Sequence, residues 1–246
     1  MSDVTDYRTD YKKRMARHEE KVNVVLGFLR AEYCSSAEMV AQLLGVEAIQ
    51  PVYRFLNTLT KKGFLRHHNF MIGGRNVRLW GLTPHGVAFS FADDEPLHDV
   101  TAFQPSSVAV STLPHKLDIQ RTRLRLEAKG ATNWHYPNAL KSNGMKQPDA
   151  LANVEGKRVA FEIERTVKSL RRYKEIVSNY LFNRKSHGID EIWYICPDAR
   201  VRLRVEKAIT GVDEIVHPTT GEARKTAILD TARLFAPFKF KTLEEL

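Results

Sequence analysis

Three carboxylates in the second half of the chain are spaced so that they could act on one chemical group. Glu162 and Glu164 lie two residues apart in the alternating segment 158–164, and Asp149 follows a proline just before the preceding apolar segment. Successive side chains of a strand point to opposite faces, so both glutamates project from one face and the apolar residues from the other. The Glu155-Gly156 pair predicts a turn that makes the two segments neighbours in a hairpin.

Carboxylates in this arrangement favour a divalent cation. Three hard oxygen donors suit Mg²⁺ or Mn²⁺. A metal held there could position a phosphate, activate a water molecule and stabilise the leaving oxygen. The same pattern also fits a solvent-exposed strand face that carries two glutamates and no metal. The residues alone leave both interpretations open.

Lys174 is the candidate cation of this site. The residues from Val167 to about His187 are predicted to form a helix, and at about 100° per residue Lys174 falls inside its apolar arc. A charge on a buried stripe is costly unless it is paired. A neighbouring carboxylate would pair it, and the lysine could then stabilise charge that develops on a phosphate. Alternatively, Lys174 extends its ammonium group to solvent from the edge of the arc.

Three further residues have side chains that could take part in chemistry. His115, near the start of a predicted helix, is either a proton carrier or phosphate contact, or a structural residue. Tyr173 and Tyr180 are conceivable nucleophiles, with core packing as the alternative. We expect attack by water rather than by tyrosine, because a carboxylate trio is of the hydrolytic type. Hydrolysis would leave free ends, whereas a tyrosine link would conserve the energy needed for rejoining.

The elements that position these residues are predicted to form an α/β domain over residues 114–246. The apolar periods and turn signals predict helices and strands in a fixed order. These are a helix at 115–129, a strand with Trp134 and Tyr136, strands at 149–152 and 158–164, a helix at 167–187, a strand at 191–196 and a helix at 199–209.

Residues 1–92 are predicted to form a winged helix-turn-helix domain. Three helices are expected at 11–32, from a capping box Ser35-Ser36-Ala37-Glu38 to Gly45, and at 47–62. Strands at 64–72 and 76–82 flank the turn Gly73-Gly74-Arg75, and Thr83-Pro84 begins a short helix through Phe91.

The outer face of the third predicted helix carries side chains that contact base edges and phosphates. These residues are Gln50, Tyr53, Arg54, Asn57, Thr58, Lys61 and Lys62, and Arg75 adds a cation at the tip of the wing. The pattern favours DNA binding. The alternative is a helical module that binds protein, in which the two lysines only end a helix in solvent.

Charge and composition narrow the class of protein. The net charge of +9 and the pI of about 9.5 indicate a polyanionic partner. Both predicted domains are basic, and an acidic connection at 93–113 with one short strand is expected between them. Two cysteines without metal-ligand spacing argue against zinc and against a disulfide framework. With no signal peptide and no apolar run of about 20 residues, a cytoplasmic location is expected.

The acidic motif resembles that of a nuclease superfamily. Pro148-Asp149 followed by Glu162-Ile163-Glu164 is similar to the PD-(D/E)xK pattern, with Glu164 in place of the usual lysine. The order helix, three strands, helix, strand is also similar to the αβββαβ core of that superfamily. The resemblance implies an α+β protein of two domains, a winged helix followed by an α/β core like that of restriction endonucleases.

A wider resemblance covers almost the whole chain. The winged helix, Pro114-His115-Lys116-Leu117, the Pro-Asp-Ala segment and Phe-Glu-Ile-Glu-Arg-Thr before a basic helix are similar to the plasmid replication-relaxation group. Within it, the chain is most similar to MobC-type relaxases of mobilizable plasmids. This implies site-specific, metal-dependent nicking of duplex DNA at a transfer origin. It also implies a relaxosome accessory protein and a type IV coupling protein as partners.

Two other functions stay open at this point. The first is a non-catalytic regulator of plasmid replication or transcription with a degenerate nuclease fold. The second is a restriction-type endonuclease, which would linearise DNA rather than nick one strand.

Overall fold

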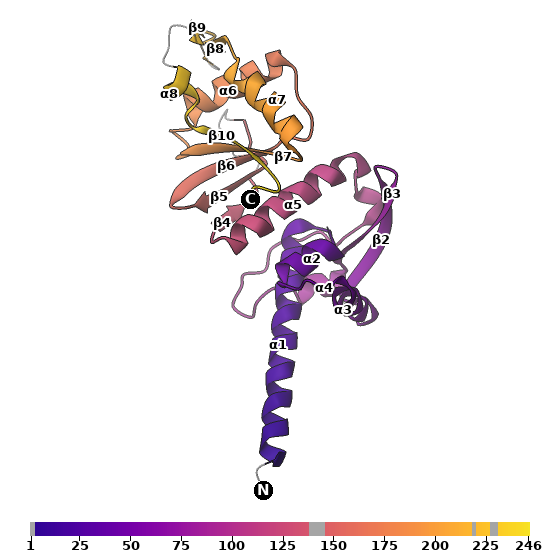
Figure 1. Ribbon diagram of the computed structural model, residues 1–246. Helices are drawn as coiled ribbons and strands as arrows, with labels where there is room; N and C mark the ends of the chain where they lie inside the picture. The colour runs from indigo at the N-terminus through magenta and orange to yellow at the C-terminus, as the bar shows by residue number, and fades with distance from the viewer. Residues whose placement is uncertain (1–2, 138–145, 218–219, 227–230) are drawn as a thin grey trace. The chain divides into compact units, whose positions relative to one another are not determined.

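The computed structural model describes residues 3–137, 146–217, 220–226 and 231–246. The chain divides into two compact units, Met1–Pro114 and His115–Leu246 (Figure 1). Each unit has its own buried apolar residues and is described by itself. Among the described residues, no helix combines the length and the apolar character needed to cross a membrane.

Unit 1 has the order of a winged helix-turn-helix. Three helices come first, and a β-hairpin follows them. The elements are α1 (Asp3–Glu32), β1 (Ser35–Ser36), α2 (Ala37–Leu43), α3 (Ile49–Lys61), β2 (Leu65–Ile72), β3 (Arg75–Leu82), α4 (Pro84–Ala88) and the short 3₁₀ turns η1 (Pro105–Ser107) and η2 (Val110–Thr112). The strands form an antiparallel sheet in the order β1-β3-β2.

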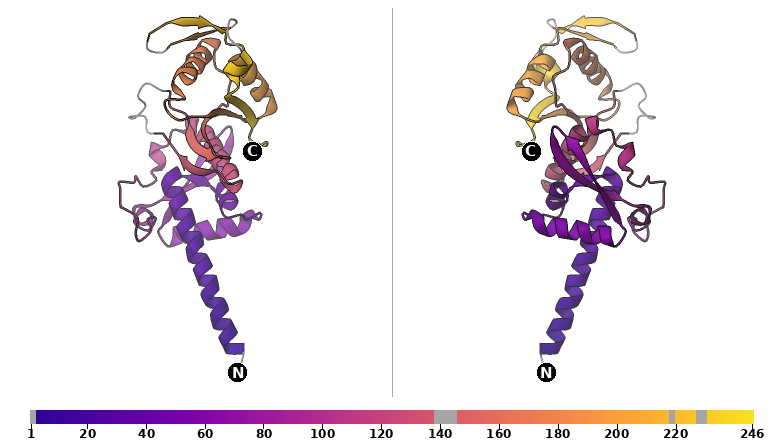
Figure 2. Two further views of the ribbon diagram at one scale, coloured as in Figure 1. Left: turned by 90° about the vertical axis from the view of Figure 1, so that its left-hand side faces the viewer. Right: turned by 90° about the vertical axis from the view of Figure 1, so that its right-hand side faces the viewer.

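The core of unit 1 is built from the apolar stripes of α1, α2 and α3 together with β3. Buried side chains recur every three or four residues, as a helix with one buried face requires. They include Val25, Leu26, Leu29, Met39, Val40, Val52, Leu56, Leu59, Leu79 and Trp80. The first half of α1 extends away from the rest of this unit (Figures 1 and 2), where Tyr11 is exposed.

Two predicted boundaries in unit 1 shift by one residue. The N-cap of α2 is Ser36, whose side chain accepts a hydrogen bond from the Met39 amide, so the expected capping box starting at Ser35 is wrong. Ser35 and Ser36 instead pair with β3 as strand β1. The wing turn consists of Gly73 and Gly74, both with positive φ, which matches a two-residue hairpin turn.

The acidic segment 93–113 packs on unit 1. Phe103 is fully buried, and its amide donates to the Leu82 carbonyl over 2.8 Å. The Gln104 amide donates to the Tyr33 hydroxyl over 2.9 Å. The segment contains the two 3₁₀ turns η1 and η2, and the short strand expected in it is absent from this described stretch.

Unit 2 is a five-stranded sheet with helices on both faces. Its elements are α5 (Leu113–Ala128), β4 (Thr132–His135), β5 (Ala150–Val154), β6 (Lys157–Ile163), α6 (Leu170–Asn183), β7 (Glu191–Cys196), α7 (Ala199–Thr210), β8 (Glu214–Val216), β9 (Ala223–Lys225), α8 (Thr231–Phe235) and β10 (Phe238–Thr242). The strand order is β10-β7-β6-β5-β4. From α5 to β7 the elements follow the predicted order.

The strands of unit 2 run in two senses. β4, β5 and β6 are antiparallel neighbours, whereas β6, β7 and β10 are parallel. The helices α6 and α7 cover one face of the sheet and α5 lies on the other (Figure 1). The separate ribbon of β8 and β9 packs against α6 (Figure 2).

The alternation predicted for β6 separates two apolar layers. Val159, Phe161 and Ile163 lie in the layer that also contains Leu126 of α5. Ala160 lies in the opposite layer, with the buried side chains of α6 and α7. The face that carries Glu162 and Glu164 is therefore the face covered by α6.

Candidate functional site

The two glutamates of the predicted site are buried at the end of β6. Only 5% of the Glu162 side chain and 4% of the Glu164 side chain are exposed. The alternative of a solvent-exposed strand face is therefore wrong. A buried carboxylate needs a partner, because removing its charge from water is costly. Each glutamate has one.

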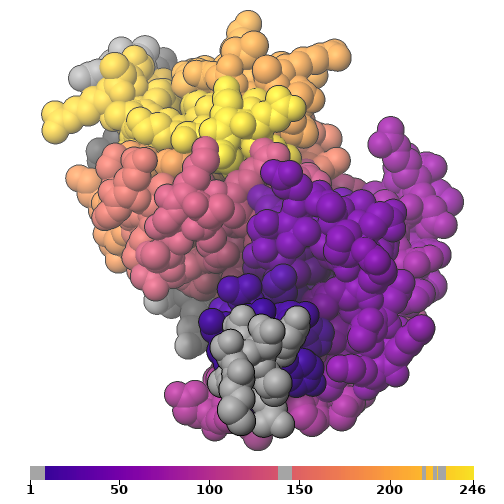
Figure 3. Space-filling model, turned by 60° about the horizontal axis from the view of Figure 1, so that its bottom comes forward, coloured from indigo at the N-terminus to yellow at the C-terminus, as the bar shows by residue number. Residues whose placement is uncertain are grey.

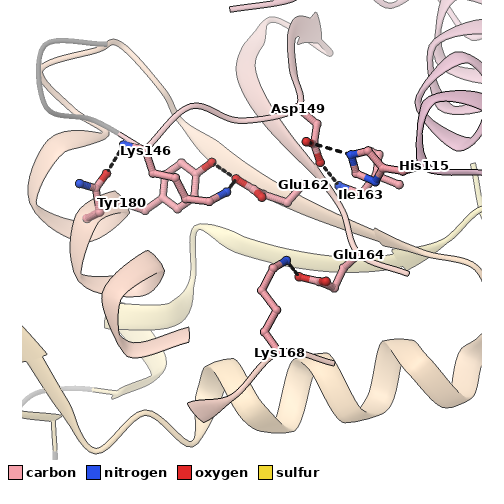
Figure 4. Close-up of polar contacts among 9 residues, drawn as sticks. His115, Lys146, Asp149, Glu162, Ile163, Glu164, Lys168 and Tyr180 are labelled. Atoms are coloured by element: carbon pink, nitrogen blue, oxygen red, sulfur yellow. Dashed lines mark hydrogen bonds and ion pairs between the residues drawn. The ribbon is translucent and has the colours of Figure 1, made fainter. Parts of the chain in front are cut away.

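Glu162 is held by a lysine and a tyrosine. Its Oε1 accepts hydrogen bonds from Lys146 Nζ and from the Tyr180 hydroxyl (Figure 4). The Lys146 amide in turn donates to Asn179 Oδ1 over 2.6 Å, which ties the segment before Asp149 to α6. Burial raises the pKa of Glu162 above its ordinary value, although the Lys146 charge opposes this effect.

Glu164 is paired with Lys168. The lysine ammonium contacts Glu164 Oε2 (Figure 4). Sequence analysis predicted a helix that begins at Val167 and would include Lys168. In the structure α6 begins at Leu170, with Ser169 as its N-cap. Lys168 therefore lies in the connection before the helix, where its side chain reaches back to β6.

Asp149 and His115 form the third pair of the site. His115 Nε2 lies 3.1 Å from Asp149 Oδ1, and the Ile163 amide donates to Asp149 Oδ2 over 2.7 Å (Figure 4). Burial alone would raise the pKa of Asp149, but the bonds from His115 and Ile163 lower it below its ordinary value. The hydrogen bond to Asp149 raises the pKa of His115.

A fourth carboxylate was missed by sequence analysis. Asp118 of α5 is buried and pairs with Arg165, which follows Glu164 directly. Arg121 also donates to Asp118 over 2.9 Å. An aspartate on the apolar side of a predicted helix could have indicated a buried ion pair. Its partner could not be identified from the sequence, because Arg165 lies 47 residues further along the chain.

The carboxylates as arranged do not fit a divalent cation. Glu162 and Glu164 each pair with a lysine, and Asp149 binds His115 and the Ile163 amide, so all three carboxylates already have partners within the protein. Among the described residues, no group of three or more His, Cys, Asp and Glu side chains could hold a metal ion. The trio expected from the sequence is thus close in the fold but does not converge on one point.

Lys174 lies in a different place from the one expected. It pairs with Glu214 of β8, and both side chains are about one-third exposed. Together with Arg171, Asn179 and His217 it lines a cavity of about 560 Å³ between α6 and the β8–β9 ribbon. A lysine is tolerated on the apolar side of α6 because Glu214 pairs with it, and sequence analysis did not consider Glu214.

The two candidate tyrosines are fully buried. Burial raises the pKa of Tyr180 well above its ordinary value, and it raises the pKa of Tyr173 to about 12. The Tyr173 hydroxyl accepts a hydrogen bond from the Lys168 amide over 3.2 Å. Both hydroxyls therefore fix neighbouring groups of the site, and neither faces the solvent from which a substrate would arrive.

Unit 1 presents the predicted basic and polar face on α3. Gln50, Arg54, Asn57, Thr58, Lys61 and Lys62 are exposed, as is Arg75 of the wing. Tyr53 is half-buried, with its ring 5.6 Å from that of Trp80. Figure 3 shows this unit in space-filling form, with the β2–β3 wing at its edge. The side chains expected to read DNA are thus accessible.

The sequence profile of the Replication-relaxation family matches residues 26–192, which is more than half of the chain. The match begins within α1 and ends in β7, so it includes parts of both units and all three predicted carboxylates. The chain therefore belongs to the Replication-relaxation family. This confirms the wider resemblance found in the sequence at the level of that family.

Two individual proteins share parts of the chain. A stretch of 58 residues is 48% identical to Mobilization protein MobB of Escherichia coli and covers 23% of this chain and 38% of that protein. A solved structure of Lactococcus lactis ZitR, a mutant in apo form, covers 35% of this chain and 64% of that one. It has 18% identity and a TM-score of 0.26, so the description of unit 1 rests on its own elements.

Proposed function

We propose that this protein binds duplex plasmid DNA through unit 1 and cuts one strand with the polar site of unit 2, as a step in plasmid mobilization. Membership in the Replication-relaxation family supports the plasmid context. The similarity to a mobilization protein over 58 residues supports mobilization. A transfer origin as target, and a relaxosome accessory protein and a type IV coupling protein as partners, are part of this proposal.

One observation carries the proposal of chemistry. Four buried or half-buried carboxylates gather with three cations and a histidine at one end of β6. Ion pairs of this kind are not an efficient way to stabilise a core, because desolvation offsets much of the attraction. Perturbed, paired titratable groups are typical of functional sites.

The chain's own residues can perform defined parts of the cleavage. His115 is 36% exposed, so it can reach a bound strand while Asp149 orients its ring through Nε2. The other ring nitrogen is then available to move a proton at the scissile phosphate. Lys146 and Lys168 can stabilise charge on the phosphate oxygens if they turn from their glutamates. We propose water as the nucleophile, because both tyrosines are buried.

The test is conversion of a supercoiled plasmid that carries the cognate origin. The reaction is run with Mg²⁺, with Mn²⁺ and without either ion. We expect open-circle product from the wild type and none from Asp149→Asn or Glu162→Gln. Lys168→Ala should cut poorly, whereas Lys174→Ala, the matched lysine on the same side of the sheet, should cut normally. Equal activity of the two lysine variants would contradict this assignment of the site.

The same assay separates the rival functions. A non-catalytic regulator is favoured by the pairing of every predicted metal ligand with a side chain of the protein itself. It requires that no open circle forms with either ion while the protein is bound to the plasmid. Linear product would indicate a restriction-type endonuclease. A protein–DNA adduct that survives denaturant and is lost in Tyr180→Phe or Tyr173→Phe would contradict attack by water.

A further inference from the structure

We infer that a basic row on α7 is a second DNA-binding surface, which contacts the phosphates of one strand. The row consists of Arg200, Arg204 and Lys207, all exposed, with exposed Leu203 between them. This inference rests on the proposed function, since it assigns to unit 2 a contact with the DNA that unit 1 would recognise.

The spacing of the row suits a phosphate backbone. Residues at positions i, i+4 and i+7 of a helix share one face. The opposite side of α7 is buried through Val205, Ala208 and Ile209. With a rise of about 1.5 Å per residue, the three cations span about 10 Å along the helix. Along the axis of duplex DNA, one strand carries a phosphate about every 3.4 Å, so this length of the axis corresponds to about three phosphates of one strand.

The three cations lack, among the described residues, the partners that several neighbouring cations have. Within the described part of the chain, none of their side chains forms an ion pair or a hydrogen bond. On the same helix Arg202 pairs with Glu206 over 3.5 Å. Elsewhere in unit 2, Lys157 pairs with Glu191 and Lys174 with Glu214. The row therefore presents uncompensated positive charge to solvent.

Folding gains little from this arrangement. Arg200 is the second residue of α7, where the positive end of the helix dipole disfavours a cation. Arg204 lies one turn later on the same face, and like charges at i and i+4 repel each other. Only Lys207, in the last turn, has a position that favours the helix. A bound polyanion would remove the repulsion, which a purely solvated face would not.

The row also leads to the candidate active site. β6 and β7 are parallel neighbours, and the Glu164 amide donates to the Ile195 carbonyl over 2.9 Å. Two residues separate the end of β7 from the start of α7, so Arg200 lies at the same end of the sheet as Glu164, which directly follows β6. Ligands of such sheets bind at the carboxyl ends of parallel strands. A strand held along α7 is thus directed toward this end of the sheet.

The experiment compares two triple variants of the full chain that lose the same charge. One is Arg200→Ala, Arg204→Ala, Lys207→Ala. The control is Lys157→Ala, Lys174→Ala, Arg202→Ala, which removes three paired cations. Fluorescence anisotropy with a short labelled duplex and with labelled oligo-dT gives the affinity between about 50 and about 200 mM salt. Thermal unfolding of each variant is measured alongside.

We expect the row variant to bind both DNA probes more weakly, with the slope of log K against log salt reduced by about 2 to 3. The control should keep the wild-type slope. The row variant should unfold no earlier than the wild type, because it loses a repulsion. A slope unchanged in the row variant, or reduced equally in both variants, would overturn the inference while leaving binding through unit 1 intact. Absence of DNA binding by the wild type would contradict the proposed function as well.

Discussion

At the scale of single residues, Glu162 shows how the carboxylates of the site are held by hydrogen bonds. Its carboxylate is buried and binds both a lysine from the segment before β5 and a tyrosine from α6. Removing the carboxylate would leave the Tyr180 hydroxyl without an acceptor, which costs about 1 to 3 kcal/mol. A glutamine keeps an acceptor at this position, and for this reason it is the better probe of chemistry.

The His115–Asp149 pair makes a prediction about pH. The raised pKa of His115 contributes stability below its ordinary value of 6.5, and this contribution is lost as the pH rises through the folded-state pKa. The lowered pKa of Asp149 contributes stability above its ordinary value of 3.8, and this is lost as the pH falls through its folded-state pKa. The pair is therefore strongest at mildly acidic pH.

We expect His115→Gln to unfold more easily than the wild type at about pH 5, by less than about 1 kcal/mol because His115 is partly exposed. The difference should narrow above the pKa of His115, where the histidine no longer carries a charge. Urea titrations across this pH range measure it, with exposed His135→Gln of the same unit as control. A difference that does not depend on pH would show that His115 acts only through packing.

At the scale of elements, the sequence predicted the helices and strands that have a local pattern but not the strand pairing between distant segments. The periods of α3, β6 and β7 are local, so sequence analysis found these elements. The parallel pairing of β10 with β7 joins residues far apart in the chain, and no local signal marks it. The start of α6 mattered most. Because α6 begins at Leu170 rather than at Val167, Lys168 precedes the helix and its side chain reaches Glu164.

The ion pairs of the site were missed for the same reason. Lys146 and Glu162 are 16 residues apart, and only the folded β5–β6 hairpin and α6 bring them together. The residue types in the sequence identified the carboxylates of the site but not the cations that pair with them. Lys174 was chosen because a lysine on the apolar stripe of a helix needs a carboxylate partner, and the structure shows that it has one. The partner is Glu214 of β8, an element that was not predicted.

A glycine fixes the packing of the acidic segment on unit 1. A Cβ at Gly81 of β3 would overlap the Phe103 ring and lie 2.6 Å from the Tyr33 carbonyl oxygen. We expect Gly81→Ala to lower the free energy of unfolding by about 1 to 3 kcal/mol, as overpacking does. Gly27→Ala on α1 is the matched control, because its Cβ meets nothing and alanine suits a helix.

The cause can be isolated with a double variant. Phe103→Gly removes both Phe103 atoms, Cβ and Cγ, with which the new methyl group would collide. The double variant should therefore lose less stability than the sum of the two single losses, since residues in contact are not additive. Strictly additive losses in urea unfolding would show that Gly81→Ala acts on β3 and not on the packing of residues 93–113.

At the scale of the whole molecule, the proposal requires that sequence recognition resides in unit 1. The exposed face of α3 combines side chains that can read bases with side chains that can contact phosphates. Its two cations within the helix are Arg54, near the middle, and Lys61, at the end. An arginine that reads a base contributes about 1 to 3 kcal/mol, whereas a lysine on a phosphate weakens binding to all sequences alike. The two contributions can be separated by measuring how the affinity depends on salt and on the DNA sequence.

We expect Arg54→Ala with Lys61→Ala to weaken binding to origin DNA by one to two orders of magnitude, at about 1.4 kcal/mol for each tenfold change. The salt slope should fall by about 1, because Lys61 contacts a phosphate, and the preference for origin over unrelated duplex should decrease, because Arg54 reads a base. Lys12→Ala with Arg14→Ala, on the extended half of α1, removes the same charge and should preserve that preference. If the α3 variant binds origin DNA normally, unit 1 is instead a protein-binding module, and the basic row of α7 would have to supply the DNA contact alone.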